Sequence, residues 1–260
     1  MKKIAVQIYE VQSPEEAQHL AESGVDHMGS VVLTQEDWRS SKLIRAFAVA
    51  RSANVKCSLI PLFSDLHAIQ QVLDYYQPDI VHFCESLMDG AEIADDCKVL
   101  VDNQEFIKRR YPQVAIMRSI PIAPANLAKW VPTLELGHLF EPVSDYFLTD
   151  TLLVDQGGNS EDLQPVNGFV GITGQTCDWQ MAAQLVQNSQ IPVMLAGGLS
   201  PDNVFNGIVQ VGPAGVDSCT GTNALDAEGK TIRFQKDWAK VKLFADETRR
   251  AQIYLEQRSG

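Results

Sequence analysis

The sequence has no long apolar run, no paired cysteine motif and no signal peptide pattern. Its apolar segments are all far shorter than the roughly 20 residues that cross a bilayer. The start, Met1-Lys-Lys-Ile4, lacks the apolar core of a secretory signal. The 5 cysteines are odd in number and spread out without a C-x-x-C pair, which argues against a zinc site or disulfide framework. We therefore predict a cytoplasmic protein.

Basic residues are also scarce. The chain has 21 Lys and Arg against 33 Asp and Glu, a formal net charge of -12. Such a charge argues against binding to nucleic acid or to an anionic membrane. The sequence has no nicotinamide or flavin fingerprint and no cluster of metal ligands, so we predict no cofactor and no metal. It leaves the oligomeric state open.

The most informative feature present is a run of glycines between an apolar segment and a helix start. Residues 192–196 are apolar, and Gly197 and Gly198 follow them. Ser200 is predicted to cap a helix with Pro201 at its first position. A strand that enters a helix through glycines leaves backbone N–H groups free to bind an anion, phosphate above all. The alternative is a plain strand–helix turn in which the glycines only permit close packing.

Short apolar strands alternate with helical patterns along the whole chain, without a linker. Eight strands with intervening helices predict a single (β/α)8 TIM barrel over residues 1–260, and a doubly wound open sheet is the structural alternative. Prolines weaken the helix between the fifth and sixth strands. The predicted strands are Lys3–Tyr9, Asp26–Leu33, Val55–Phe63, Asp79–Cys84, Val114–Ile120, Asp145–Asp150, Ile191–Ala196 and Ala214–Cys219. The predicted helices cover about 13–23, 41–52, 66–76, 103–110, 178–188, 201–209 and 234–256.

In a barrel of this type the chemistry lies at the carboxyl ends of the strands, which form the mouth. Alternation along each strand decides which side chains point inward. Ile4, Val6 and Ile8 suit the helix-facing side of the first strand. The polar groups expected to face inward near the mouth are Tyr9, His82, Cys84, Arg118, Asp150, Asp217 and Cys219, with Ser218 as the alternative on the last strand. Polar groups that converge in this way are typical of a ligand site.

Four segments resemble phosphoribosylanthranilate isomerases. They are Val6–Gln12 with Gly24–Asp26, Thr149–Thr151 with Gly171–Trp179, Leu195–Val204, and Gly215–Gly221 with the lysines that follow. The resemblance implies a phosphate-binding (β/α)8 barrel. It also implies an aldose–ketose isomerase of tryptophan biosynthesis acting on a small phosphorylated sugar derivative, with phosphoribosylanthranilate as the first candidate.

The same resemblance implies roles for single residues. The phosphate would be bound by backbone amides of Gly197, Gly198, Thr220, Gly221, Thr173 and Gly174. Asp150 corresponds to the family's general acid, whose pKa a partly buried site can raise. Arg39 is the nearest candidate to hold the substrate carboxylate, and a solvated surface role is its alternative. His82 and Arg118 are expected to contact the substrate.

The chain departs from the family pattern at the position of the general base. The family has a cysteine near the end of the first strand, and this chain has Tyr9, a weak base at neutral pH. Cys84, His82 and Glu10 are the other candidates for the base. Ile172 occupies the first glycine position of the glycine loop. The segment after Asp150 is longer than usual, so we expect a lid insertion at residues 152–170.

These departures leave three hypotheses. The first is an isomerase with Asp150 as acid and with Tyr9 or Cys84 among the candidate bases. The second is a catalytically silent relative that binds a phosphorylated ligand in a regulatory role. The third is a lyase or aldolase, for which Lys56 is the weak candidate for a Schiff base.

Overall fold

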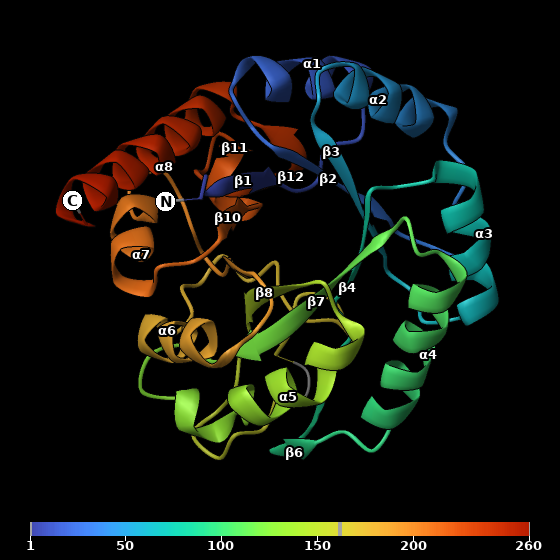
Figure 1. The fold of residues 1–260 in the computed structure, drawn as a ribbon, viewed down its shortest axis with the longest axis vertical. Coiled ribbons are helices and arrows are strands. Elements are labelled where there is room, and N and C mark those ends of the chain that lie inside the picture. Colours follow the sequence, from blue (N-terminus) through green and yellow to red (C-terminus); the bar gives the residue numbers. More distant parts are fainter. Residues whose placement is uncertain (1, 161–162, 260) are drawn as a thin grey trace.

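Eight parallel strands close into a barrel, in the order β1-β10-β9-β8-β7-β4-β3-β2 (Figure 1). The computed structural model describes residues 2–160 and 163–259. The barrel strands are β1 (Ala5–Ile8), β2 (His27–Val32), β3 (Lys56–Pro61), β4 (Ile80–Phe83), β7 (Ala115–Ile122), β8 (Tyr146–Thr151), β9 (Val193–Leu195) and β10 (Gly215–Ser218). This confirms the predicted TIM barrel and excludes the open sheet.

Eight α-helices of the described chain surround the barrel (Figure 1). They are α1 (Pro14–Glu22), α2 (Ser41–Ser52), α3 (Leu66–Tyr76), α4 (Cys97–Arg110), α5 (Thr133–Phe140), α6 (Trp179–Asn188), α7 (Val204–Val211) and α8 (Trp238–Ser259). Short 3-10 turns are η1 (Ala128–Trp130), η2 (Glu141–Val143) and η3 (Thr220–Thr222). Within the described residues, none of the helices combines the length and apolar character needed to span a membrane.

Two small hairpins extend the barrel loops. β5 (Met88–Asp89) pairs with β6 (Glu92–Ile93), and β11 (Asn223–Leu225) pairs with β12 (Thr231–Lys236). The prediction of a helix from residue 234 is wrong, because Phe234 lies in β12 with a φ of 60° and α8 begins only at Trp238. A left-handed backbone at that residue cannot continue a right-handed helix.

The helix starts were predicted with mixed success. Ser13 caps α1 as expected, since its side chain accepts a hydrogen bond from the Glu16 amide at 3.2 Å. The predicted cap of α7 is wrong by three residues. Asn203 is the residue before that helix, and its side chain accepts from the Ser200 amide and donates to the Gly198 carbonyl. The segment from Ser200 to Asn203 is therefore a separate turn.

The strand interiors confirm most of the predicted alternation. Ile4, Val6 and Ile8 pack in the outer layer between the strands and helices. The barrel centre is filled by Ile80, Met117, Leu148, Met194 and Ala196. The expected inward position of Arg118 is wrong by one residue, because its neighbours Met117 and Ser119 face the interior. Its guanidinium instead lies 4.7 Å from the centre of the Phe140 ring, in the helix layer.

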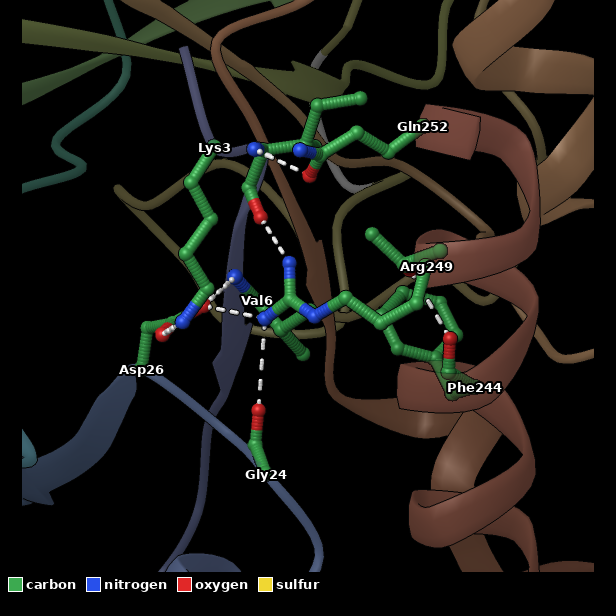
Figure 2. A network of polar contacts seen from close by, with 9 residues as sticks. Lys3, Val6, Gly24, Asp26, Phe244, Arg249 and Gln252 are labelled. Carbon is green, nitrogen blue, oxygen red and sulfur yellow. Dashed lines mark hydrogen bonds and ion pairs between the residues drawn. The ribbon is translucent and has the colours of Figure 1, made fainter. Parts of the chain in front are cut away.

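A polar network joins the beginning of the chain to its last helix (Figure 2). Asp26 lies at its centre, where it accepts hydrogen bonds from the Val6 amide at 2.9 Å, from Arg249 at 2.7 Å and from Lys3. Burial alone would raise the pKa of Asp26, but these hydrogen bonds together lower it below its ordinary value. Arg249 also donates to the Ile4 carbonyl, so α8 is fixed against the start of β1.

Candidate active site

A cavity opens at the carboxyl ends of the strands. Its empty volume is about 800 Å³, part of which is open to solvent. Its walls come from the ends of β1, β2, β3, β4, β8, β9 and β10 and from the long segment after β8. Of the residues predicted to form the site, the cavity wall contains Tyr9, His82, Cys84, Asp150, Thr173, Gly174, Gly197, Gly198, Thr220 and Gly221. Arg39 and Arg118 are not part of it.

On one side of the cavity, Tyr9 belongs to a chain of buried hydrogen bonds. Its hydroxyl lies 2.7 Å from Ser58 Oγ and 2.7 Å from His82 Nδ1, and His82 Nε2 lies 2.8 Å from Ser119 Oγ. Burial lowers the pKa of His82 to about 3, which leaves its imidazole neutral. Burial also raises the pKa of Tyr9 well above its ordinary value. Neither group therefore suits proton abstraction at neutral pH.

The Tyr9 ring packs against Gly29 on β2. A Cβ built on Gly29 would lie 2.3 Å from the ring, so no larger residue fits there without moving the tyrosine. Tyr9 is 4% exposed. Tyr9, which is larger than the cysteine of the family pattern, therefore fits at the end of β1 because Gly29 has no side chain.

The other two candidate bases, Cys84 and Glu10, are also poorly suited to remove a proton from a ligand. Burial, followed by the charges of Glu85 and Asp150, raises the pKa of the Cys84 thiol well above its ordinary value. Glu10 is buried and forms an ion pair with Arg233, with 2.6 Å between the guanidinium and the carboxylate. Its φ of 63° turns the chain at the end of β1 and directs the side chain to the β11–β12 hairpin.

Asp150 at the end of β8 lines the cavity. Burial raises its pKa to about 7, although the Thr151 amide donates a hydrogen bond to Oδ1 at 2.9 Å and opposes that rise. Gly171, with a φ of 105°, lies so close that a Cβ there would be 2.2 Å from Oδ2. A carboxyl group with this pKa is partly protonated at neutral pH and can donate a proton to a ligand.

A second carboxyl group, that of Asp217 at the end of β10, lines the same cavity. Burial and then the charge of Asp150 raise its pKa to about 8. Among the described residues, none forms a hydrogen bond with its buried Oδ1 atom. Strand alternation predicted Asp217 at the mouth. Its coupling to Asp150 could not be predicted from the sequence, because the two strands are separated by β9.

The predicted phosphate site is built from three loops that meet on the Asp150 side. Gly174, Gly197 and Gly198 have φ values of 67°, 84° and 65°. A Cβ on Gly198 would lie 2.5 Å from the Gln175 carbonyl carbon, and one on Gly221 would lie 2.1 Å from the Leu199 oxygen. The glycines therefore allow the loops to approach one another. Within residues 2–160 and 163–259, no acceptor is hydrogen-bonded to the amides of Thr173, Gly174, Gly197 or Gly198.

The predicted lid lies against the opposite rim. The Ser86 amide donates to the Gly168 carbonyl at 2.8 Å, and the Val170 amide donates to the Cys84 carbonyl at 2.9 Å. Val166, Phe169 and Val170 thereby line the cavity. Residues 161–162 of the predicted insertion lie outside the described part of the chain.

The predicted arginines lie elsewhere. Arg118 donates to the Glu85 carboxylate at 2.5 Å and to the Glu85 carbonyl at 3.1 Å, so it supports the rim from behind. Arg39 is exposed, and its guanidinium lies 4.6 Å from the centre of the Trp38 ring and 5.9 Å from that of Tyr75. Its loop is held there because the Tyr76 hydroxyl donates to the Trp38 carbonyl at 2.6 Å.

Lys56, the Schiff-base candidate, is exposed at the first residue of β3. The mouth lies at the other end of that strand. Lys56 therefore cannot form a Schiff base at the mouth, and the aldolase hypothesis loses its candidate lysine.

Comparison with known proteins gives one consistent result. A model of the N-(5'phosphoribosyl)anthranilate (PRA) isomerase family matches residues 122–246. N-(5'-phosphoribosyl)anthranilate isomerase 2 of Methanosarcina mazei is 30% identical over 203 residues, which are 69% of this chain and 81% of that protein. The isomerase of Methanocella arvoryzae is 27% identical over 236 residues, 90% of this chain and 95% of that protein.

The solved structures agree in fold. The phosphoribosyl anthranilate isomerase of Thermotoga maritima superimposes with a TM-score of 0.65 at 20% identity, covering 95% of this chain and 98% of that one. A second isomerase structure, in complex with reduced 1-(o-carboxyphenylamino)-1-deoxyribulose 5-phosphate, gives a TM-score of 0.64 at 19% identity over the same shares. At these identities the likeness establishes the barrel and its topology.

Proposed function

Because the chain belongs to the N-(5'-phosphoribosyl)anthranilate isomerase family, we propose that it is an aldose–ketose isomerase of N-(5'-phosphoribosyl) amines. N-(5'-phosphoribosyl)anthranilate, an intermediate of tryptophan biosynthesis, is the first substrate to try. The observation that carries the proposal is the position of Asp150. Its carboxyl group, with a pKa of about 7, lines the same cavity as unpaired backbone amides suited to a phosphate.

The phosphate would bind at the amides of Gly197 and Gly198, with those of Thr173, Gly174, Thr220 and Gly221 around it. Backbone N–H groups that converge at a loop stabilise an anion without a cationic side chain. This mode suits a chain whose net charge is -12, because the attraction is local.

In the first chemical step, Asp150 donates its proton to the ring oxygen of the sugar. The C1–O bond breaks, and the nitrogen lone pair forms the C=N bond of an iminium ion. The raised pKa of Asp150 keeps the acid form populated near neutral pH, as general acid catalysis requires.

In the second step, ionised Asp217 removes the proton from C2. The electron pair of that C–H bond forms the C1=C2 bond of an enolamine, and the π electron pair of the C=N bond returns to nitrogen. The proton on Asp217 then goes to C1, while Asp150 accepts the proton of the C2 hydroxyl. The product is a ketose, and both carboxyl groups have regained their starting protonation. The unpartnered Oδ1 of Asp217 supports this role better than the engaged side chains of Tyr9 and His82. Because the pKa of Asp217 is about 8, its ionised form, which acts as the base, becomes the major form only above that pH.

The segment over residues 152–170 would act as the lid of this site. The backbone bonds of Gly168 and Val170 to the β4 rim hold its second half across the cavity, where Phe169 and Val166 exclude water. Exclusion of water strengthens every electrostatic interaction between the carboxyl pair and a ligand.

One observation supports the catalytically silent hypothesis. Tyr9, at the position of the family's base, is hydrogen-bonded to Ser58 and His82. Complementation of a tryptophan auxotroph that lacks this isomerase separates the two functions. We expect growth with the natural chain, and loss of growth with Asp150→Asn. Asp202→Asn, an exposed change at the turn before α7, is the matched control. A soluble, folded chain that neither restores growth nor isomerises the purified substrate would leave only the binding function.

A further inference from the structure

The cavity is lined by acidic, neutral polar and apolar side chains. Among the described residues that line it are three carboxylic acids and no lysine or arginine: Glu10, Asp150 and Asp217. The apolar part of the lining, here called the apolar wall, includes Val31, Ile60, Leu62, Val166, Phe169 and Ile172. Residues 161–162, outside the described part, are Glu and Asp in the sequence, so they add no cation.

Four cationic side chains of the elements around the mouth already have partners. Arg233 is paired with Glu10, and Arg118 with Glu85. Lys236 donates to the Cys219 carbonyl at 2.9 Å and to the Asn223 side chain at 2.5 Å. Arg39 lies on Trp38, outside the cavity. A ligand carboxylate would therefore have to compete with an existing partner for any of these groups.

A carboxylate on the non-phosphate half of a substrate would be poorly stabilised here. Transfer of a charged group into an apolar environment without a partner is strongly unfavourable. The ionised forms of the three acids would repel it further. An uncharged aromatic or aliphatic group would instead gain free energy from burial against Leu62, Ile60 and Phe169.

Taking the proposed isomerisation as its basis, we infer that the preferred substrate is an N-(5'-phosphoribosyl) amine whose amine part is uncharged and apolar. The site accepts the phosphoribosyl half by its amides and selects the amine half by its apolar wall. An aniline-type substrate therefore fits this chain better than anthranilate, which carries a carboxylate.

The test compares kcat/KM of the purified chain for N-(5'-phosphoribosyl)aniline and N-(5'-phosphoribosyl)anthranilate. We expect the aniline derivative to be favoured by about 10-fold or more, as expected where one charged group lacks a partner. Equal values, or a preference for anthranilate, would overturn the inference while leaving the proposed isomerase function in place.

A variant sharpens the comparison. Leu62→Arg puts a guanidinium into the half-buried apolar wall and should shift the ratio about 10-fold toward anthranilate. Leu33→Arg makes the same change at a side chain that is 49% exposed and not part of the cavity wall, so it should leave the ratio unchanged. An unchanged ratio in a folded Leu62→Arg protein would also contradict the inference.

Calorimetric binding separates this inference from the proposed reaction. The probes are reduced 1-phenylamino-1-deoxyribulose 5-phosphate and its o-carboxyphenylamino counterpart. If neither amine is isomerised but the phenylamino compound binds about 10-fold more tightly, the ligand class holds and the reaction fails. If the carboxylated compound binds equally or more tightly, the ligand class fails whatever the activity.

Discussion

The two sides of the barrel mouth use polar groups in opposite ways. On the β1–β4 side, a linear chain of buried hydrogen bonds joins Ser58, Tyr9, His82 and Ser119. On the β8–β10 side, Asp150 and Asp217 have raised pKa values. The amides of Thr173, Gly174, Gly197 and Gly198 have no acceptor among the described residues.

Buried polar groups are usually paired, and unpaired ones require an explanation. Each polar side chain of the Tyr9 cluster has at least one partner, and its burial makes it part of the core. The β8–β10 side has the polar groups that lack hydrogen-bond partners and that a ligand could bind. Chemistry is therefore expected on that side, even though the family's base lies on the other.

The largest expected effect comes from Asp217. Asp217→Asn keeps the shape of the side chain but removes a base, so kcat should fall by about 100-fold or more while KM changes little. The measurement is steady-state kinetics with N-(5'-phosphoribosyl)anthranilate and its aniline analogue. Asp202→Asn, which changes an exposed aspartate, should have the natural rate. If Asp217→Asn keeps the full rate, Asp217 is not the base, and the base must be sought on the Tyr9 side of the mouth.

A smaller loss should follow from a change in the phosphate loops. In Gly198→Ala, the added Cβ would lie 2.5 Å from the Gln175 backbone, at a residue whose φ is 65°. The loops must separate, and KM should rise by about 10-fold or more with a smaller change in kcat. Gly212→Ala, also at a positive φ but with open space around it, is the control for backbone strain. If the two variants have the same KM, the phosphate is bound elsewhere.

The carboxyl pair should also affect stability. Because the pKa values of Asp150 and Asp217 are raised from 3.8 to about 7 and 8, the folded chain binds their protons more tightly than the unfolded chain. Their contribution is therefore complete below about pH 4 and is lost as the pH rises through about 8. Urea unfolding of the natural chain should show this decline. The double variant Asp150→Asn with Asp217→Asn should show a flatter profile, and identical profiles would contradict the raised values.

The sequence predicted the barrel and the glycine turn at Gly197 and Gly198 because their signals are local. That this turn binds phosphate stays a prediction. Glycines, a capping serine and short apolar strands each determine the conformation of a few adjacent residues. The same local signals placed Asp150 and Asp217 at the mouth.

The errors arise where local signals are absent. Both faces of β7 are buried, so alternation could not decide between Arg118 and its neighbours. The position of Arg39 depends on contacts of its loop with Tyr76, 37 residues further along the chain. The link between Asp150 and Asp217 depends on two strands that are not adjacent in the barrel. Each of these facts requires the folded chain.

The smallest expected effect on catalysis separates the two sides most directly. Tyr9→Phe removes one hydroxyl and leaves Ser58 and His82 without their shared partner, which should lower the free energy of unfolding by about 1–3 kcal/mol. Activity should stay within about 3-fold, since Asp217 is the proposed base. Tyr76→Phe is the matched control, because its buried hydroxyl also has two partners but lies outside the mouth cavity. Similar stability losses with natural rates in both variants would identify Tyr9 as a structural residue. A fall in kcat of about 100-fold confined to Tyr9→Phe would instead make the phenol part of the proton transfer.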